Sequence, residues 1–282
     1  MLNRKLPLLL VCAGLVSGCG LAEGVAAFYG FPVHQYTPET LSAKLRPHDR
    51  WYFPETSQAA PGVLIVPGCA GTHEFHHEWA TFLQEHGFAV LIIDSFAARD
   101  VIEPQDLEGV CEGEHTWGFE RAGDILVSLD EMRSSPQVDA ESLNLMGWSH
   151  GGWSVIDAVL LASASKTPPF LTELPSSGMQ GVKNVVALYP YCDFGSFVNE
   201  LPWPTEGIRG WVVLASNDQN IEPQPCYDAI AKQLEQQALL DQHILDVDHW
   251  FDNPRGFDVV PHEYAEEETA AVRQEVLRRF SF

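Results

Sequence analysis

Positive charge is scarce in this chain of 282 residues, which has 16 Lys and Arg against 39 Asp and Glu and a formal net charge of −23 at pH 7. A surface with this excess of negative charge repels phosphate backbones and anionic lipid headgroups. We therefore expect no nucleic acid among the partners, and we assign the acidic side chains a role in solubility rather than in an active site.

A long hydrophobic run is also missing. The apolar residues 6–16 follow Arg4 and Lys5 and are too few to span a bilayer as a helix, a pattern typical of a secretory signal peptide. The run closes with Val16-Ser17-Gly18-Cys19, which resembles the lipobox of bacterial lipoproteins, where the cysteine thiol receives a diacylglyceryl group. We therefore predict a lipoprotein signal peptide at residues 1–18 and a lipid anchor at Cys19.

This prediction places the protein outside the cytoplasm, on the bacterial membrane. By analogy with lipoprotein sorting in enterobacteria, Gly20 rather than Asp after the cysteine favours the outer membrane, facing the periplasm. An ordinary signal peptide cut nearby and an uncleaved anchor are the alternatives. Loss of residues 1–18 removes two bases and no acid, so the formal net charge of the mature chain is −25.

Internal repeats and low-complexity stretches are absent too, and the sequence indicates no second hydrophobic core. With 45% hydrophobic and 20% charged residues, the composition is that of an ordinary globular protein. We predict one domain over residues 50–282, preceded by a linker and lead-in at residues 19–49. Scattered prolines and short aromatic pieces indicate that residues 20–61 supply the antiparallel first strands of a sheet.

What the chain does contain is an alternation of buried strands and helices. Continuous apolar runs bounded by turn residues predict strands that are buried on both faces. The predicted strands are residues 62–66, 88–94, 143–146, 185–189, 211–215 and 243–247, and the predicted helices are residues 74–86, 117–133, 225–240 and a last one that begins near residues 263–268. This order implies an α/β fold, with a mainly parallel, twisted sheet and helices on both faces.

The middle strand ends in Gly147-Trp148-Ser149-His150-Gly151, a G-x-S-x-G pentapeptide between a strand and a helix. In a nucleophile elbow the serine occupies a strained turn, so both outer positions need glycine. The turn exposes the Ser149 hydroxyl and places the backbone N–H of His150, at a helix N-terminus, where an oxyanion can form. The simpler alternative is a glycine-rich turn with a spectator serine.

With these elements in order, the chain resembles an α/β-hydrolase. More narrowly, the segments VPGCAG at 66–71, FAVLIIDSF at 88–96, GWSHGG at 147–152 and DVDHWFDNP at 246–254 resemble the dienelactone hydrolase family, and the resemblance covers residues 60–280. It implies the α/β-hydrolase fold and activity on esters or lactones. Dienelactone hydrolases proper use a cysteine nucleophile, whereas this chain has Ser149, as in serine-bearing relatives that are esterases.

The resemblance also implies the other catalytic groups. A serine hydroxyl needs a histidine to take its proton and a carboxylate to orient that histidine. The family places its acid in the loop after strand 211–215 and its histidine after the last strand, which gives Asp218 and His249. Asp193, after the preceding strand, is the alternative acid, and the alternative for His249 is a histidine simply buried in the core.

The second oxyanion donor and the disulfides follow from the same fold. The loop after strand 62–66 supplies the donor, with the N–H of Cys69 as first candidate and that of Ala70 as second. The mature domain keeps four cysteines in an oxidising compartment, and this even number predicts two disulfides. In the strand order of the fold, the strands before Cys69 and Cys111 are neighbours, as are those before Cys192 and Cys226, which favours these two pairs.

Two further groups of residues have other interpretations. His73-Glu74-Phe75-His76-His77 fits H-E-x-x-H, the zinc-protease pattern in which two histidines bind the metal and the glutamate activates water. Here the pattern opens a helix just after a glycine-rich turn and a third ligand cannot be placed, so we expect no metal. Arg121 and Asp124, one helical turn apart, are predicted to form an ion pair at the surface or in a groove.

Together these patterns predict a serine hydrolase that cleaves a small carboxylic ester or lactone through an acyl-enzyme, with no metal or organic cofactor. The modest loop at residues 190–208 leaves no room for a lid domain, which favours a small substrate. The alternatives are a peptidase on the same fold, a zinc metalloprotease that uses the HEFHH segment, and a binding lipoprotein without catalytic activity.

Overall fold

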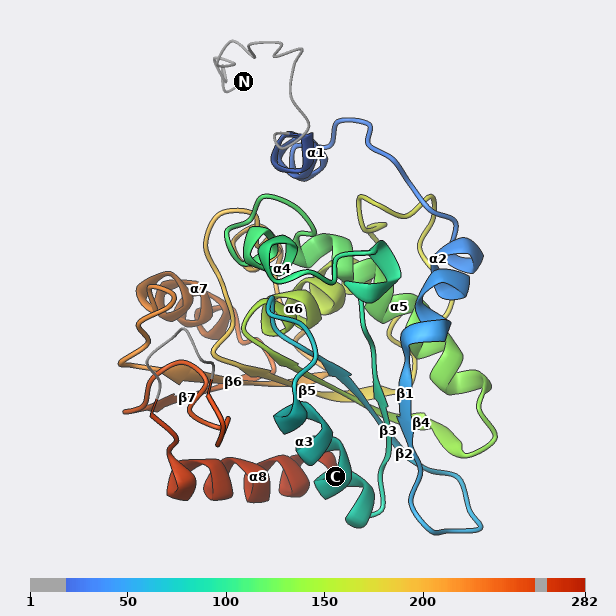
Figure 1. Ribbon diagram of the computed structural model, residues 1–282, viewed down its shortest axis with the longest axis vertical. Coiled ribbons are helices and arrows are strands. Elements are labelled where there is room, and N and C mark those ends of the chain that lie inside the picture. Colours follow the sequence, from blue (N-terminus) through green and yellow to red (C-terminus); the bar gives the residue numbers. More distant parts are fainter. Residues whose placement is uncertain (1–18, 257–262, 282) are drawn as a thin grey trace.

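The computed structural model describes residues 19–256 and 263–281, and the predicted signal peptide lies outside them (Figure 1). Its centre is a seven-stranded sheet in the order β1-β3-β2-β4-β5-β6-β7. Within the described residues, β1 pairs antiparallel with β3, and every other pair of neighbouring strands is parallel. The strands are β1 (Arg50–Tyr52), β2 (Ala60–Val66), β3 (Ala89–Ile92), β4 (Val138–Trp148), β5 (Val182–Leu188), β6 (Arg209–Ala215) and β7 (Leu240–Leu245).

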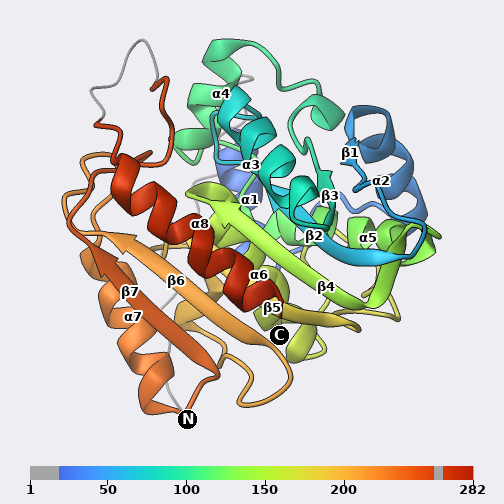
Figure 2. The same cartoon turned by 90° about the horizontal axis from the view of Figure 1, so that it is seen from below.

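Helices cover both faces of this sheet, which confirms the predicted fold class. One face carries α3 (Glu74–Glu85) and α8 (Glu266–Phe280), which cross in front of the strands in Figure 2. The opposite face carries α5 (Gly118–Ser134), α6 (His150–Ser163) and α7 (Gln224–Glu235). Because β2 and β4 to β7 are parallel, the loops after them all leave from one edge of the sheet, which we call the carboxyl edge.

Two hydrophobic cores lie on the two faces of the sheet, and the strands contribute side chains to both. In β2, Val63 and Ile65 pack with α3 and α8, whereas Leu64 and Val66 pack with α5 and α6. Successive side chains of a strand point to opposite faces. A strand buried on both sides must therefore be apolar at every position, which is the pattern that predicted it.

The lead-in is mostly helical, which corrects part of the prediction. Of residues 20–61, β1 is an antiparallel strand, but α1 (Cys19–Phe28) and α2 (Pro38–Leu45) are helices. The start of α2 is encoded locally: the Thr37 hydroxyl accepts a hydrogen bond from the backbone N–H of Thr40, and Pro38 fits the first helical position. Buried Leu41 and Leu45 then attach α2 to α5.

The remaining differences are small shifts and one missed helix. Strand β7 begins at Leu240, where a helix was predicted to end, and α7 ends at Glu235. Helix α4 (Pro104–Cys111) was not predicted; its start is marked by a proline at the first position. None of the helices in the described part of the chain is both long and apolar enough to cross a membrane.

Candidate active site

Ser149 occupies a sharp turn between β4 and α6. Its backbone dihedrals are φ 52° and ψ −116°, a conformation that L-residues rarely adopt. Glycine is required on both sides: a Cβ at Gly151 would lie 2.0 Å from the Val66 carbonyl oxygen, and one at Gly147 would lie 2.3 Å from the Gly151 carbonyl oxygen. The pentapeptide therefore forms the strained elbow that its sequence predicted.

Asp218 and His249 meet at the same edge of the sheet. Asp218 Oδ2 lies 2.6 Å from His249 Nδ1, and the two side chains are 3% and 1% exposed. The other carboxylate oxygen accepts the backbone N–H groups of Asn220 and Ile221, both at 2.9 Å, so the loop itself orients the carboxylate. With Nδ1 donating to Asp218, the neutral ring has its lone pair at Nε2, the atom that can accept a proton.

The elbow and the histidine are linked through the ends of neighbouring strands. The Ser149 N–H donates to the carbonyl of Leu188. Tyr189 follows Leu188, and the centre of its ring lies 4.5 Å from the centre of the His249 ring. Within the described residues no hydrogen bond joins the Ser149 hydroxyl to His249, as is common in hydrolases without substrate. Asp193, the alternative acid, is exposed in the loop after β5, and the carboxylate bound to His249 is that of Asp218.

The two predicted oxyanion donors lie beside the elbow. His150 is the first residue of α6, and its N–H is one of those at a helix N-terminus that lack a partner within the helix. Cys69 follows Gly68, where a Cβ would lie 3.5 Å from the Ser149 Cβ. The Gly71 N–H donates to the Gly68 carbonyl and closes the loop that presents the Cys69 N–H.

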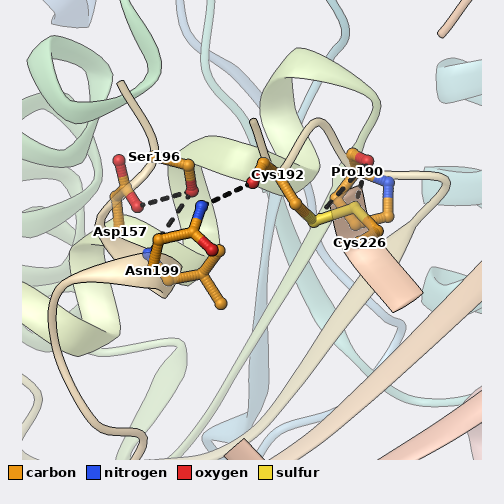
Figure 3. Close-up of a disulfide and its surroundings, with 7 residues drawn as sticks. Asp157, Pro190, Cys192, Ser196, Asn199 and Cys226 are labelled. Carbon is orange, nitrogen blue, oxygen red and sulfur yellow. Dashed lines mark hydrogen bonds between the residues drawn. A yellow bond between two sulfur atoms is a disulfide. The ribbon is translucent and has the colours of Figure 1, made fainter. Parts of the chain in front are cut away.

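Both disulfides are present, in the predicted pairs. Cys69 is bonded to Cys111 at the end of α4, with Cα atoms 5.0 Å apart, so the loop with the candidate donor is attached to a helix. Cys192 is bonded to Cys226 in α7, with Cα atoms 4.9 Å apart (Figure 3). Each bond fixes one loop at the carboxyl edge.

The loop between β5 and β6 is held at further points, some of them drawn in Figure 3. Asp157 Oδ1 of α6 accepts the Phe197 N–H at 2.9 Å, and Asn199 Nδ2 donates to the Cys192 carbonyl at 2.8 Å. From α7, the Gln233 amide donates to the carbonyls of Val198 and Leu201 and accepts the Trp203 N–H. The loop is therefore bonded to two helices along most of its length.

One family model matches part of the chain. The model of the dienelactone hydrolase family matches residues 50–185. The matched segment includes Ser149 but ends before Asp218 and His249, so these two rest on the geometry above. A comparison with curated proteins gives no match.

Solved structures resemble the chain along most of its length. A dienelactone hydrolase-like promiscuous phosphotriesterase from metagenomic libraries is 18% identical, with a TM-score of 0.59 over 83% of this chain and 91% of that one. A carboxylesterase from Lactobacillus plantarum is 16% identical (TM-score 0.58, 82% and 90%). Esterase 2 of Thermogutta terrifontis, phosphoramylated by tabun, is 10% identical (TM-score 0.61, 82% and 88%). The likeness confirms the α/β-hydrolase fold.

Arg121 and Asp124 do not form the predicted ion pair. Both are fully buried, and Asp124 instead binds both terminal nitrogens of Arg99 at 2.9 Å. Arg121 points the other way and contacts the elbow and the loop after β2. Helical spacing correctly placed Arg121 and Asp124 one turn apart. It could not show that Arg99, from another segment of the chain, binds the Asp124 carboxylate.

The HEFHH segment starts α3 instead of lying within a helix. His73 is the N-cap residue, and its Nε2 lies 2.9 Å from the Ala70 carbonyl oxygen. His77 Nδ1 lies 2.6 Å from the Tyr52 hydroxyl, and buried His76 accepts the His73 N–H. The described part of the chain has no group of three or more His, Cys, Asp or Glu residues placed to hold a metal ion.

Sequence reasoning missed a buried carboxylate next to the site. Asp252, three residues after His249, accepts hydrogen bonds from Trp79 Nε1 (3.0 Å), Trp148 Nε1 (2.7 Å) and the Tyr189 hydroxyl (2.7 Å). Burial raises the pKa of Asp252 above its usual value, and the three hydrogen bonds offset only part of that rise. The carboxylate ties the histidine loop to α3, to the residue before Ser149 and to the end of β5. Its partners are scattered along the chain, so no local pattern indicates it.

Proposed function

We propose that the chain is a serine hydrolase of the dienelactone hydrolase family that cleaves a small carboxylic ester or lactone through an acyl-enzyme. The observation that supports this most is the 2.6 Å hydrogen bond between Asp218 and His249, on the edge of the sheet that also carries Ser149 at its strained turn. Strain of this kind persists where the surrounding structure imposes it, and it is typical of functional sites.

The proposed reaction uses the chain's own groups in two stages. Ser149 Oγ attacks the carbonyl carbon while His249 Nε2 takes its proton, and Asp218 stabilises the imidazolium that forms. The N–H groups of His150 and Cys69 bind the oxyanion of the tetrahedral intermediate. Collapse of the intermediate breaks the ester C–O bond, and His249 returns the proton to the leaving alcohol. Water, deprotonated by His249, then attacks the acyl-enzyme and releases the acid and Ser149.

Two observations favour a small ester. The loop between β5 and β6, which borders the carboxyl edge, is bonded to α6 and α7 and forms no separate lid domain in the described structure. In addition, the similar solved structures include a carboxylesterase and an esterase.

A fluorophosphonate probe and a substrate panel test the proposal. We expect the probe to label the wild-type protein at Ser149 and small p-nitrophenyl esters or lactones to be hydrolysed, because both reactions need an activated serine. Peptide anilides should be poor substrates, and a chelator should leave the rate unchanged. Absence of both labelling and esterase activity would favour a binding protein, and loss of activity with chelator would favour a metalloprotease.

We also propose that the mature protein is anchored through a lipidated Cys19, in the outer membrane and facing the periplasm. The lipobox-like segment before Cys19 supports this. Thioether-linked and amide-linked acyl chains together exceed the marginal membrane hold of a single chain, so the protein should partition into detergent. Mass spectrometry of the N-terminal peptide should find an acylated Cys19, and Cys19→Ser should yield a soluble or unprocessed product. An unmodified N-terminus at another residue would contradict the anchor.

A further inference from the structure

Arg121 is a fully buried guanidinium without a carboxylate hydrogen-bonded to it among the described residues. Three acids act on its charge from a distance: Asp124 and Glu120, which bind Arg99, and Asp94, which accepts the backbone N–H groups of Phe96 and Ala97. Burial lowers the pKa of Arg121 to about 10, so the side chain still carries its charge at neutral pH. A buried cation without a bonded anion is costly, which raises the question of what it stabilises.

The three donor nitrogens of Arg121 reach three different segments. Nη2 donates to the Pro67 carbonyl at 2.9 Å, two residues before Cys69. Nε donates to the Ser95 hydroxyl at 3.1 Å, in the loop after β3, and Nη1 lies 3.0 Å from His150 Nδ1. The guanidinium also lies over the Phe96 ring, 4.6 Å from its centre. Arg121 thus joins the loop of one candidate oxyanion donor to the residue that supplies the other.

The His150 ring is held on both sides. Arginine can only donate, so His150 Nδ1 must accept, and the neutral ring carries its proton on Nε2. The ring also has a backbone hydrogen-bond partner at Thr116, just before α5. Burial, and then the charge of Arg121, lower the pKa of His150 well below its usual value, so the ring stays neutral. The contacts with Arg121 and Thr116 hold the ring in place at the first turn of α6.

We propose that Arg121 is the positioning residue of the oxyanion site, which sets the spacing between the Cys69 and His150 N–H groups. This inference rests on the proposed function. An oxyanion site works only if its donors are in place before charge develops. Arg121 meets this need because one guanidinium bonds both to the loop after β2, at the Pro67 carbonyl, and to the His150 ring at the start of α6.

The test compares Arg121→Met with Arg133→Met. Arg133 lies on the same helix and likewise donates to backbone carbonyls, those of Gly178 and Gln180, but at the far end of α5. Arg121→Met should lower kcat for a p-nitrophenyl ester by about 10²-fold, because a small misplacement of catalytic groups costs that much. KM should change far less. Arg133→Met should keep the wild-type kcat.

Thionoester substrates separate positioning of the donors from damage to the fold. Sulfur accepts hydrogen bonds weakly, so an oxyanion site speeds ester hydrolysis more than thionoester hydrolysis. Arg121→Met should therefore lower the ester-to-thionoester rate ratio, by about 10-fold if much of the oxyanion stabilisation is lost. A general loss of folded enzyme or a defect in proton transfer lowers both rates alike. Arg121→Lys keeps the charge but not the planar arrangement of donors. Its ester-to-thionoester rate ratio should lie between those of the wild type and Arg121→Met.

Each outcome decides for or against the role of Arg121. An unchanged rate ratio in folded Arg121→Met, whether the rates fall or not, would overturn it. If Arg121→Met does not fold, Ser95→Ala replaces it in the test, because this change removes just one of the three partners of Arg121. A rate ratio in Ser95→Ala equal to that of the wild type would then overturn the proposed role of Arg121. If the wild-type protein hydrolyses no ester at all, the proposed function fails instead, so the two failures are distinguishable.

Discussion

Replacing Ser149 by alanine should abolish ester hydrolysis and fluorophosphonate labelling while the protein stays folded. The hydroxyl is the proposed nucleophile, and removal of such a group from a triad lowers kcat by about 10⁴- to 10⁶-fold. The fold should tolerate the change, because alanine keeps the same Cβ in the strained turn and the hydroxyl has no hydrogen-bond partner within the described residues. Steady-state kinetics with a p-nitrophenyl ester measure the first effect, and a thermal unfolding curve the second.

A serine at the far end of the helix that follows Ser149 provides the control. Ser163 is exposed at the end of α6, and Ser163→Ala should retain wild-type kcat and labelling. Wild-type activity in Ser149→Ala, with labelling at another residue, would reject the assignment of the nucleophile. Loss of labelling with retained ester hydrolysis would point to a reaction that does not pass through this serine.

Replacing Asp252 by leucine should cause the largest loss of stability among single substitutions near the site. The carboxylate is fully buried and is the shared acceptor of two indole N–H groups and one phenol. Its removal leaves three donors without a partner in a place that water does not reach. Each buried donor left without a partner costs about 1–3 kcal/mol, so with three of them we expect the free energy of unfolding to fall by at least about 3 kcal/mol. Urea unfolding followed by tryptophan fluorescence measures it.

Two other variants define the cause of that loss. Asp252→Asn keeps the shape and one acceptor oxygen but places an amide N–H₂ against other donors, so the loss should be intermediate. Asp228→Asn, at an exposed position on α7, should change the free energy of unfolding by less than about 0.5 kcal/mol. A folded Asp252→Leu protein with wild-type stability would show that the three donors find other partners.

The central sheet could be predicted because its signal is local. Strand β2 is apolar at successive positions, and Gly147 and Gly151 mark the turn around Ser149, so a short window of sequence contains the whole pattern. The positions of Asp218 and His249 followed from the fold, since each comes after a strand that ends at the carboxyl edge. Their hydrogen bond is in the structure, while their roles in catalysis stay a proposal.

The parts that could not be predicted depend on partners far away in the sequence. Arg121 was paired with its helix neighbour Asp124, because helical spacing is visible in a sequence and the approach of Arg99 is not. Asp252 escaped notice because its donors come from α3, β4 and the end of β5. In the lead-in, the scattered prolines suggested strands. In the structure, Thr37 is instead the N-cap of α2 and Pro38 is its first helical residue.

The bonded loop between β5 and β6 has a consequence for how a substrate is selected. Its disulfide to α7 and its hydrogen bonds to Asp157 and Gln233 fix the loop before any ligand arrives. A rim fixed in advance loses little conformational entropy on binding, so more of the contact energy appears as affinity. It also gives up the ability to close around poorly fitting molecules. For the proposed esterase, discrimination between substrates then depends on a shape that is already present in the free protein.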